Sequence, residues 1–219
     1  METGSTAPEL RLEIVNSILH GFGILFGIIS MPILIASAAM SGNIAGITGS
    51  GIYGFCFLML FTFSTLYHGF QQPKIKEVLK ILDHISIYFL IAGTYTPIIL
   101  IFVYNSFGIT LLIILWSLTA VGIFFKIFFT GRFEIASVII YILMGWILFT
   151  GGNSFFESMP TAVIALITIG GGLYSIGVIF YLWHKYRYHH AVWHLFVLAA
   201  AICHYVAILI AVGRASPVS

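Results

Sequence analysis

The sequence predicts an all-α membrane protein built as a bundle of seven transmembrane helices. Of its 219 residues, 60% are hydrophobic and only 7% are charged, and the mean hydropathy is +1.09. A soluble domain carries about 25% charged residues because its surface faces water. Long apolar runs exclude a transmembrane barrel, whose strands need only about 10 residues. The absence of polar tracts, and the presence of only two cysteines, exclude disordered chains and disulfide-rich secreted domains.

The positions of the charged residues divide the chain into candidate spans. A Lys, Arg or Asp at bilayer depth costs roughly 2.5–3.5 kcal/mol on insertion scales, so we read the uncharged windows 14–73, 84–125, 135–156, 158–184 and 188–213. A spanning helix needs about 20 apolar residues, so the first two windows each hold two spans, separated by the turn-rich segments 40–46 and 104–108. The predicted helices are 14–38, 48–69, 79–103, 107–128, 133–151, 161–183 and 189–212.

These helices form a single predicted domain at 14–212, between a short polar segment at 1–13 and a tail at 213–219. The first segment lacks the basic start and cleavage site of a signal peptide, so we expect the first helix to stay attached. Eight of the nine Lys and Arg residues fall on the side of the N-terminus, and Arg214 falls on the other. The positive-inside rule therefore predicts a cytoplasmic N-terminus and an external C-terminus.

Polar side chains from three distant segments are expected to meet near the cytoplasmic face. Ser64 and His68 end the second predicted helix, Asp83 lies near the start of the third, and His190 and His194 begin the seventh. Each i, i+4 pair shares one helix face, about 6 Å apart along the axis. Two imidazoles at this spacing can bind one ion, and a third from another helix completes the three-ligand set of a catalytic zinc site.

The expected roles follow from side-chain chemistry. His68, His190 and His194 are the candidate ligands of Zn²⁺, Asp83 orients a ligand or takes a proton, and Ser64 donates a hydrogen bond to an oxyanion. Asp83 as a helix cap and Ser64 as a packing residue are the structural alternatives.

The remaining histidines have simpler expected roles. We interpret His20, His184 and His189 as interfacial residues. His204 lies about 15 Å deeper than His194 and is expected to be a neutral core histidine bonded to a neighbour, with a cavity or proton-relay role as the alternative.

The pattern Ser64-Thr-Leu-Tyr-His68, Asp83-His-Ile-Ser-Ile-Tyr and His190-Ala-Val-Trp-His194 resembles the hemolysin III family, the bacterial branch of the progestin and adipoQ receptors, which are related to the alkaline ceramidases. The resemblance covers nearly the whole chain. It implies a seven-helix protein of the bacterial cytoplasmic membrane, with zinc on the three histidines and Ser64 and Asp83 beside it. The related proteins are associated with hydrolysis of lipid amides.

Three functions remain open from the sequence. The first is a zinc-dependent intramembrane hydrolase of a lipid amide or ester, with membrane lipids as substrates. The second is a non-enzymatic sensor or regulator in which zinc staples 48–69 to 189–212. The third is a pore-forming hemolysin, which ranks last because the chain lacks the amphipathic segment that a secreted toxin needs. Gly23 and Gly27 form a small-xxx-small pair that suggests a homo-oligomer, and nothing suggests nucleic acid.

Overall fold

The computed structural model describes residues 7–152 and 156–214, and this part of the chain consists of helices joined by short turns and loops. Its helices are α1 (Ala7–Met40), α2 (Ile44–Gly69), α3 (Pro73–Phe102), α4 (Ser106–Phe129), α5 (Glu134–Gly145), the 3₁₀ helix η1 (Ile147–Gly151), α7 (Thr161–Leu182) and α8 (His189–Arg214). The described residues include no strand, which confirms the predicted all-α class.

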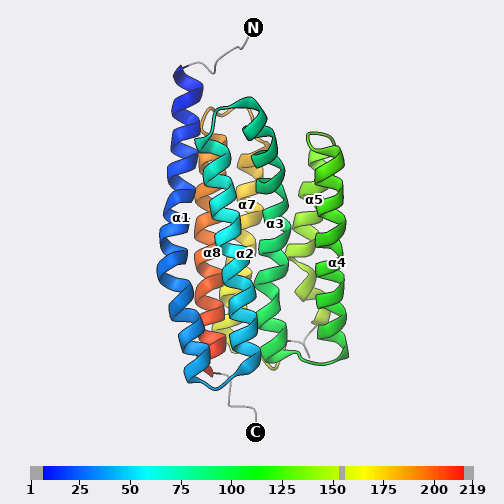
Figure 1. Ribbon diagram of the computed structural model, residues 1–219. Coiled ribbons are helices and arrows are strands. Elements are labelled where there is room, and N and C mark those ends of the chain that lie inside the picture. Colours follow the sequence, from blue (N-terminus) through cyan, green and yellow to red (C-terminus); the bar gives the residue numbers. More distant parts are fainter. Residues whose placement is uncertain (1–6, 153–155, 215–219) are drawn as a thin grey trace.

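The long helices run side by side and alternate in direction (Figure 1). α2 packs extensively against α1 and α3, α7 packs against α8, and α1 also contacts α8. α4 and α5 lie on the far side of α3 from α1. The start of α1 and the end of α8 lie at opposite ends of the bundle, and the α2–α3 and α7–α8 connections lie at the same end as the start of α1. The basic residues thus gather at one end, as predicted, while which side of the membrane that end faces stays a prediction.

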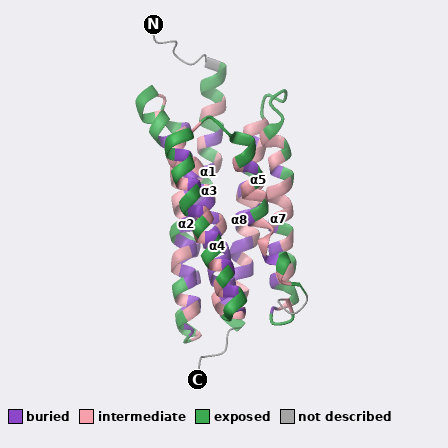
Figure 2. Cartoon of the chain, turned by 90° about the vertical axis from the view of Figure 1, so that its right-hand side faces the viewer, coloured by how far each residue is buried: buried purple, intermediate pink, exposed green. Residues whose placement is uncertain are grey.

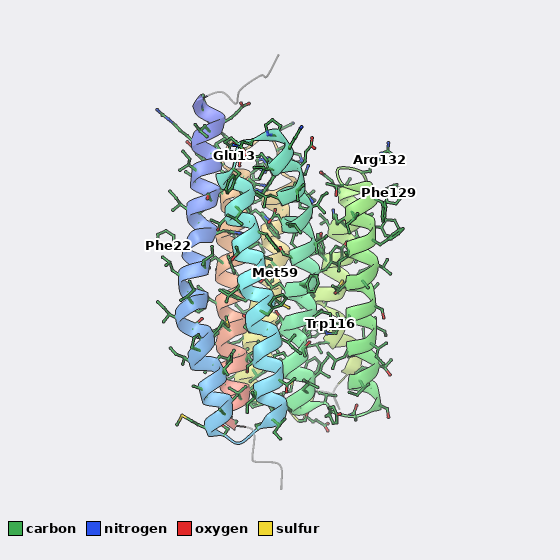
Figure 3. All side chains as sticks on the ribbon, in the orientation of Figure 1. Glu13, Phe22, Met59, Trp116, Phe129 and Arg132 are labelled. Atoms are coloured by element: carbon green, nitrogen blue, oxygen red, sulfur yellow. The ribbon has the colours of Figure 1, made fainter. Side chains whose placement is uncertain are left out.

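The outer surface of the bundle is apolar, as lipid contact requires. Buried residues lie where helices face one another, whereas exposed residues cover the outer faces and the ends (Figure 2). Phe22 on α1 and Phe124 on α4 are more than half exposed, and Phe22 projects away from the bundle (Figure 3). The core is aromatic, with Tyr53, Phe57 and Tyr88 at most 1% exposed.

Within the described residues, six helices are long and apolar enough to cross a membrane, and these are α1, α2, α3, α4, α7 and α8. The predicted span at 133–151 is instead divided into α5, of 12 residues, and η1, of five residues. Their combined rise is about 28 Å, close to the roughly 30 Å of the hydrocarbon layer. A seventh complete crossing therefore stays a prediction.

Two helices begin earlier in the chain than predicted. α1 begins at Ala7 rather than 14, so part of the expected polar segment is helical, and α3 begins at Pro73 rather than 79. Charged residues mark the edge of the hydrocarbon layer but do not end a helix, which continues into the aqueous interface. The start of the expected tail also belongs to α8, which ends at Arg214, and residues 215–219 lie outside the described part of the chain.

Two predicted turns are confirmed by side-chain caps. Asn43 Oδ1 accepts a hydrogen bond from the Gly46 amide at 2.9 Å, and Asn105 Oδ1 accepts one from Gly108 at 3.0 Å. The backbone N–H groups in the first turn of a helix have no carbonyl partner within the helix, and each asparagine side chain accepts a hydrogen bond from one of them. These caps begin α2 and α4.

Candidate metal centre and its cavity

Three histidines from two helices converge at the end of the bundle where the basic residues gather. His68 lies in the last turn of α2, and His190 and His194 lie in the first turns of α8. One ring nitrogen from each lies within 4.8 Å of the others, and the Nε2 atoms of His68 and His194 are 3.0 Å apart. His68 and His194 are buried and His190 is half-buried. The predicted three-histidine cluster is therefore present.

The donor set fits a zinc ion. Zn–N bonds of about 2.0–2.1 Å place two ligands of a tetrahedral ion about 3.3 Å apart. One pair of nitrogens here is 3.0 Å apart, and all three donor atoms lie within 4.8 Å of one another, so they are close enough to share one ion. Neutral imidazoles also bind copper, nickel and iron. The structure thus supports a divalent metal site, with Zn²⁺ as the candidate ion.

Glu13 on α1 is part of this site, and sequence reasoning missed it. Its Oε2 atom lies 2.7 Å from Nδ1 of His68, and its Oε1 atom lies 3.0 Å from Nζ of Lys76 on α3. A carboxylate only accepts hydrogen bonds, so Nδ1 of His68 carries the proton and Nε2 presents its lone pair to the cluster. Glu13 and His20 are seven residues apart, which is two turns along one helix face. This relationship was not visible from the sequence because the predicted helix began at residue 14, whereas α1 begins at Ala7.

His20 also belongs to the site, so its interpretation as an interfacial residue was wrong. Its side chain is 2% exposed, and its ring lies 3.9 Å from that of His194 and 5.0 Å from that of Phe61, measured between centroids. Neither of its ring nitrogens has a hydrogen-bond partner among the described residues. The packing of α1 against α2 and α8 turns this helix face inward, whereas His184 in the α7–α8 connection is exposed.

Ser64 and Asp83 face a common cavity with His190 and His194. Ser64 is fully buried, and its hydroxyl makes no hydrogen bond of ordinary geometry within the described residues. Asp83 extends from the third turn of α3, where its backbone carbonyl accepts a hydrogen bond from Ser86 at 2.6 Å. The structure thus brings both side chains beside the histidines, while their catalytic roles stay predictions.

The cavity extends from the histidines toward the middle of the bundle. Its walls come mainly from α3, α5, α7 and α8, and most of the lining is apolar, including Leu90, Val138 and Val197. His204 lines its deep part and donates a hydrogen bond to the Ile167 carbonyl at 3.3 Å, as expected for a core histidine bonded to a neighbour. Ten helical residues separate His194 from His204, so these two lining residues lie about 15 Å apart along α8.

The fold and the site define a multi-pass helical membrane protein with a buried three-histidine cluster above an apolar cavity. A family model described as Haemolysin-III related matches residues 9–205, and the chain belongs to this family.

Two bacterial relatives cover almost the whole chain. It is 43% identical over 192 residues to Hemolysin-3 of Bacillus cereus, covering 88% of each protein. It is 42% identical over 200 residues to the Hemolysin-3 homolog of Bacillus subtilis (strain 168), covering 91% of this chain and 94% of the relative. Together with the apolar helices, these relatives establish an integral multi-pass membrane protein, which in bacteria lies in the cytoplasmic membrane.

A more distant relative is human. The Monocyte to macrophage differentiation factor of Homo sapiens is 25% identical over 214 residues, covering 94% of this chain and 86% of the relative. The similarity therefore covers most of both chains.

Proposed function

We propose that the protein is a zinc-dependent hydrolase that cleaves an amide or ester bond of a membrane lipid. The observation that carries the proposal is the position of the three-histidine cluster at one end of a long apolar cavity, beside an acid and a hydroxyl. A ligand set of three neutral histidines leaves a coordination position open for water or substrate. When bound, zinc supplies Lewis-acid chemistry and lowers the pKa of water.

The residues of this chain divide the remaining tasks. Asp83 accepts the proton of the attacking water and returns it to the leaving group. Ser64, whose buried hydroxyl has no ordinary hydrogen bond, donates one to the carbonyl oxygen as negative charge develops there. Glu13 holds the ring of His68, and the apolar walls contributed by α3, α5, α7 and α8 hold an acyl chain and exclude water.

The first experiment measures metal in the detergent-purified protein and in His68→Ala and His194→Ala. We expect about one zinc per chain in the wild type and none in the variants. The second measures release of fatty acid from a panel of lipid amides and esters by wild type, Asp83→Asn and Ser64→Ala. Asp83→Asn is expected to retain zinc and lose turnover, and turnover by Asp83→Asn would remove the assigned base.

The main alternative to a hydrolase is a protein in which the metal only holds helices together, and one observation favours it. α2 and α8 have few direct contacts, and the cluster joins the end of α2 to the start of α8. In a sensor or regulator, zinc would link the two helices without chemistry. This alternative predicts that His68→Ala lowers the melting temperature strongly while Asp83→Asn changes neither stability nor any activity.

Pore formation is a second alternative, which is favoured by the name of the two Bacillus relatives. It predicts lysis of erythrocytes by purified protein at low dose, lost when oligomerisation is blocked. The uniformly apolar outer surface gives the chain no evident water-soluble form, so we rank this alternative last.

A further inference from the structure

We propose that the groove between α4 and α5 binds an anionic membrane phospholipid, with its headgroup held by Lys126 and Arg132. The groove lies on the opposite side of α3 from α1, and none of the three clustered histidines lines it. Its lining is apolar along its length, with Leu118, Val121 and Ile140 among its walls, and the two basic residues line it as well. The proposal is separate from the metal chemistry.

Lys126 is a buried cation whose charge is not balanced locally. It lies one turn before the end of α4 and is 6% exposed. Among the described residues, the lysines found in ion pairs are Lys76 and Lys80, not Lys126. Glu134 interacts with both Lys80 and Lys126, but its ion pair, at 3.9 Å, is with Lys80. One carboxylate between two lysines leaves a net positive charge, and a buried ammonium is costly without an anion nearby.

Lys126 faces two spaces at once. Its side chain lines the α4–α5 groove and also the cavity that reaches the histidines. An anion in the groove therefore contacts an ammonium that the protein has already removed from bulk water. This arrangement strengthens the attraction compared with that of a lysine on an exposed loop.

Arg132 supplies the second cation at the entrance of the groove. It lies in the short connection between α4 and α5, at the same end of the bundle as Glu13 (Figure 3). Its neighbours Phe129 and Phe133 also line the groove and are exposed at 37% and 63%. Aromatic side chains beside basic ones are typical of the depth where lipid headgroups meet the hydrocarbon layer. A planar guanidinium is well suited to a phosphate group.

The surroundings of the groove indicate why the occupant is a lipid rather than a soluble anion. Val121 is 50% exposed, and Phe124 and Phe128 on the same helix are 55% and 64% exposed. This face of α4 is therefore in contact with bilayer chains, and only an amphiphile can place an anion on Lys126 and an acyl chain along Val121. The charge pattern selects a phospholipid with a net negative headgroup over a zwitterionic one.

The test is a lipid titration of the full-length protein, read by native mass spectrometry at about 150 mM salt, where charges farther apart than roughly 8 Å are screened. Phosphatidylglycerol and phosphatidylcholine are compared on the wild type and on the double variant Lys126→Met/Arg132→Gln. We expect the wild type to prefer phosphatidylglycerol and the double variant to bind it roughly 10- to 30-fold more weakly.

The matched control is Lys74→Met/Arg187→Gln, which removes two exposed basic residues at the same end of the bundle, outside the groove. It is expected to remain within about twofold of the wild type. Equal loss in both double variants would reduce the effect to general attraction by the basic end and overturn the site, as would unchanged binding in Lys126→Met/Arg132→Gln.

A second variant tests the groove without altering charge. Ala136 is exposed and lines the groove, so Ala136→Trp fills the space and retains both cations. It is expected to lose the tight phosphatidylglycerol site while melting within a few degrees of the wild type. Glycerol 1-phosphate is added as a soluble competitor: failure to displace the lipid supports the proposal, and complete displacement would show that the acyl groove contributes nothing and overturn it.

Discussion

The carboxylate of Glu13 on α1 lies 2.7 Å from Nδ1 of His68 on α2, and the same carboxylate pairs with Lys76 on α3 at 3.0 Å. Three helices are thus joined through one side chain at the edge of the candidate metal site. A carboxylate bonded to the far nitrogen of a ligating histidine fixes its ring orientation and raises its basicity. Glu13 is therefore expected to act on the metal through His68 rather than by direct coordination.

Glu13→Gln is expected to weaken metal affinity roughly tenfold and Glu13→Ala up to about 100-fold, because each removes the charged acceptor from His68. Chelator competition with the purified protein measures this affinity. Glu77→Gln, an exposed glutamate on α3, is the matched control and is expected to leave affinity unchanged. Equal affinity in Glu13→Ala and the wild type would mean that the carboxylate serves only the ion pair with Lys76.

His20 is expected to support the site by packing and not to ligate the metal, because the cluster of close donor atoms consists of His68, His190 and His194. His20→Phe should therefore retain the full zinc content, since a phenyl ring fills the same space between His194 and Phe61. His20→Ala should lower the free energy of unfolding by about 2–5 kcal/mol through the cavity it leaves. Loss of zinc from a stably folded His20→Phe would show that His20 is a ligand.

Gly170 allows α7 to approach His204 on α8. A Cβ atom at Gly170 would lie 2.3 Å from Nε2 of His204, so Gly170→Ala must displace the ring and break its hydrogen bond to Ile167. We expect a loss of about 1–3 kcal/mol in unfolding free energy. Gly172→Ala, two residues along the same helix with no atom within 4 Å of the added Cβ, should be neutral or slightly stabilising. Thermal melts of both variants test this: Gly170→Ala is expected to melt at a lower temperature than Gly172→Ala. Similar melting temperatures would show that the contact between Gly170 and His204 does not limit stability.

Gly23 and Gly27, which the sequence suggested as a contact between subunits, lie between α1 and α2 of the same chain. A Cβ on Gly23 would lie 2.1 Å from Phe61, and one on Gly27 would lie 2.6 Å from Leu58, so both glycines pack α1 against α2. Gly23→Ala is expected to destabilise the monomer by about 1–3 kcal/mol, while Gly21→Ala, which meets nothing within 4 Å, is not. Melting and light scattering on the same samples test this. A change of oligomeric state in Gly23→Ala without a change in stability would restore the glycines as a subunit interface.

The sequence by itself determined the membrane environment, most of the helices and the end at which the chemistry gathers. These properties depend on local composition: apolar runs must be long enough to cross lipid, charges avoid its interior, and i, i+4 spacing places His190 and His194 on one face. The meeting of His68 with that pair followed from counting helices, because consecutive helices alternate in direction. The 133–151 segment was less well predicted, since apolar composition does not reveal where a helix changes to a 3₁₀ turn.

Only the tertiary structure decided which helix faces meet. α1 is exposed to lipid over much of its length, and nothing in its composition shows that Glu13 and His20 point at the histidines of α2 and α8. In the sequence, Lys126 is likewise an ordinary basic residue near the end of a helix. Only the structure shows that it is buried beside residues of α3 and α5. The rotation of each helix about its axis depends on the side chains of its neighbours, such as the contact of Phe61 with Gly23, and this information is distributed over distant segments of the chain.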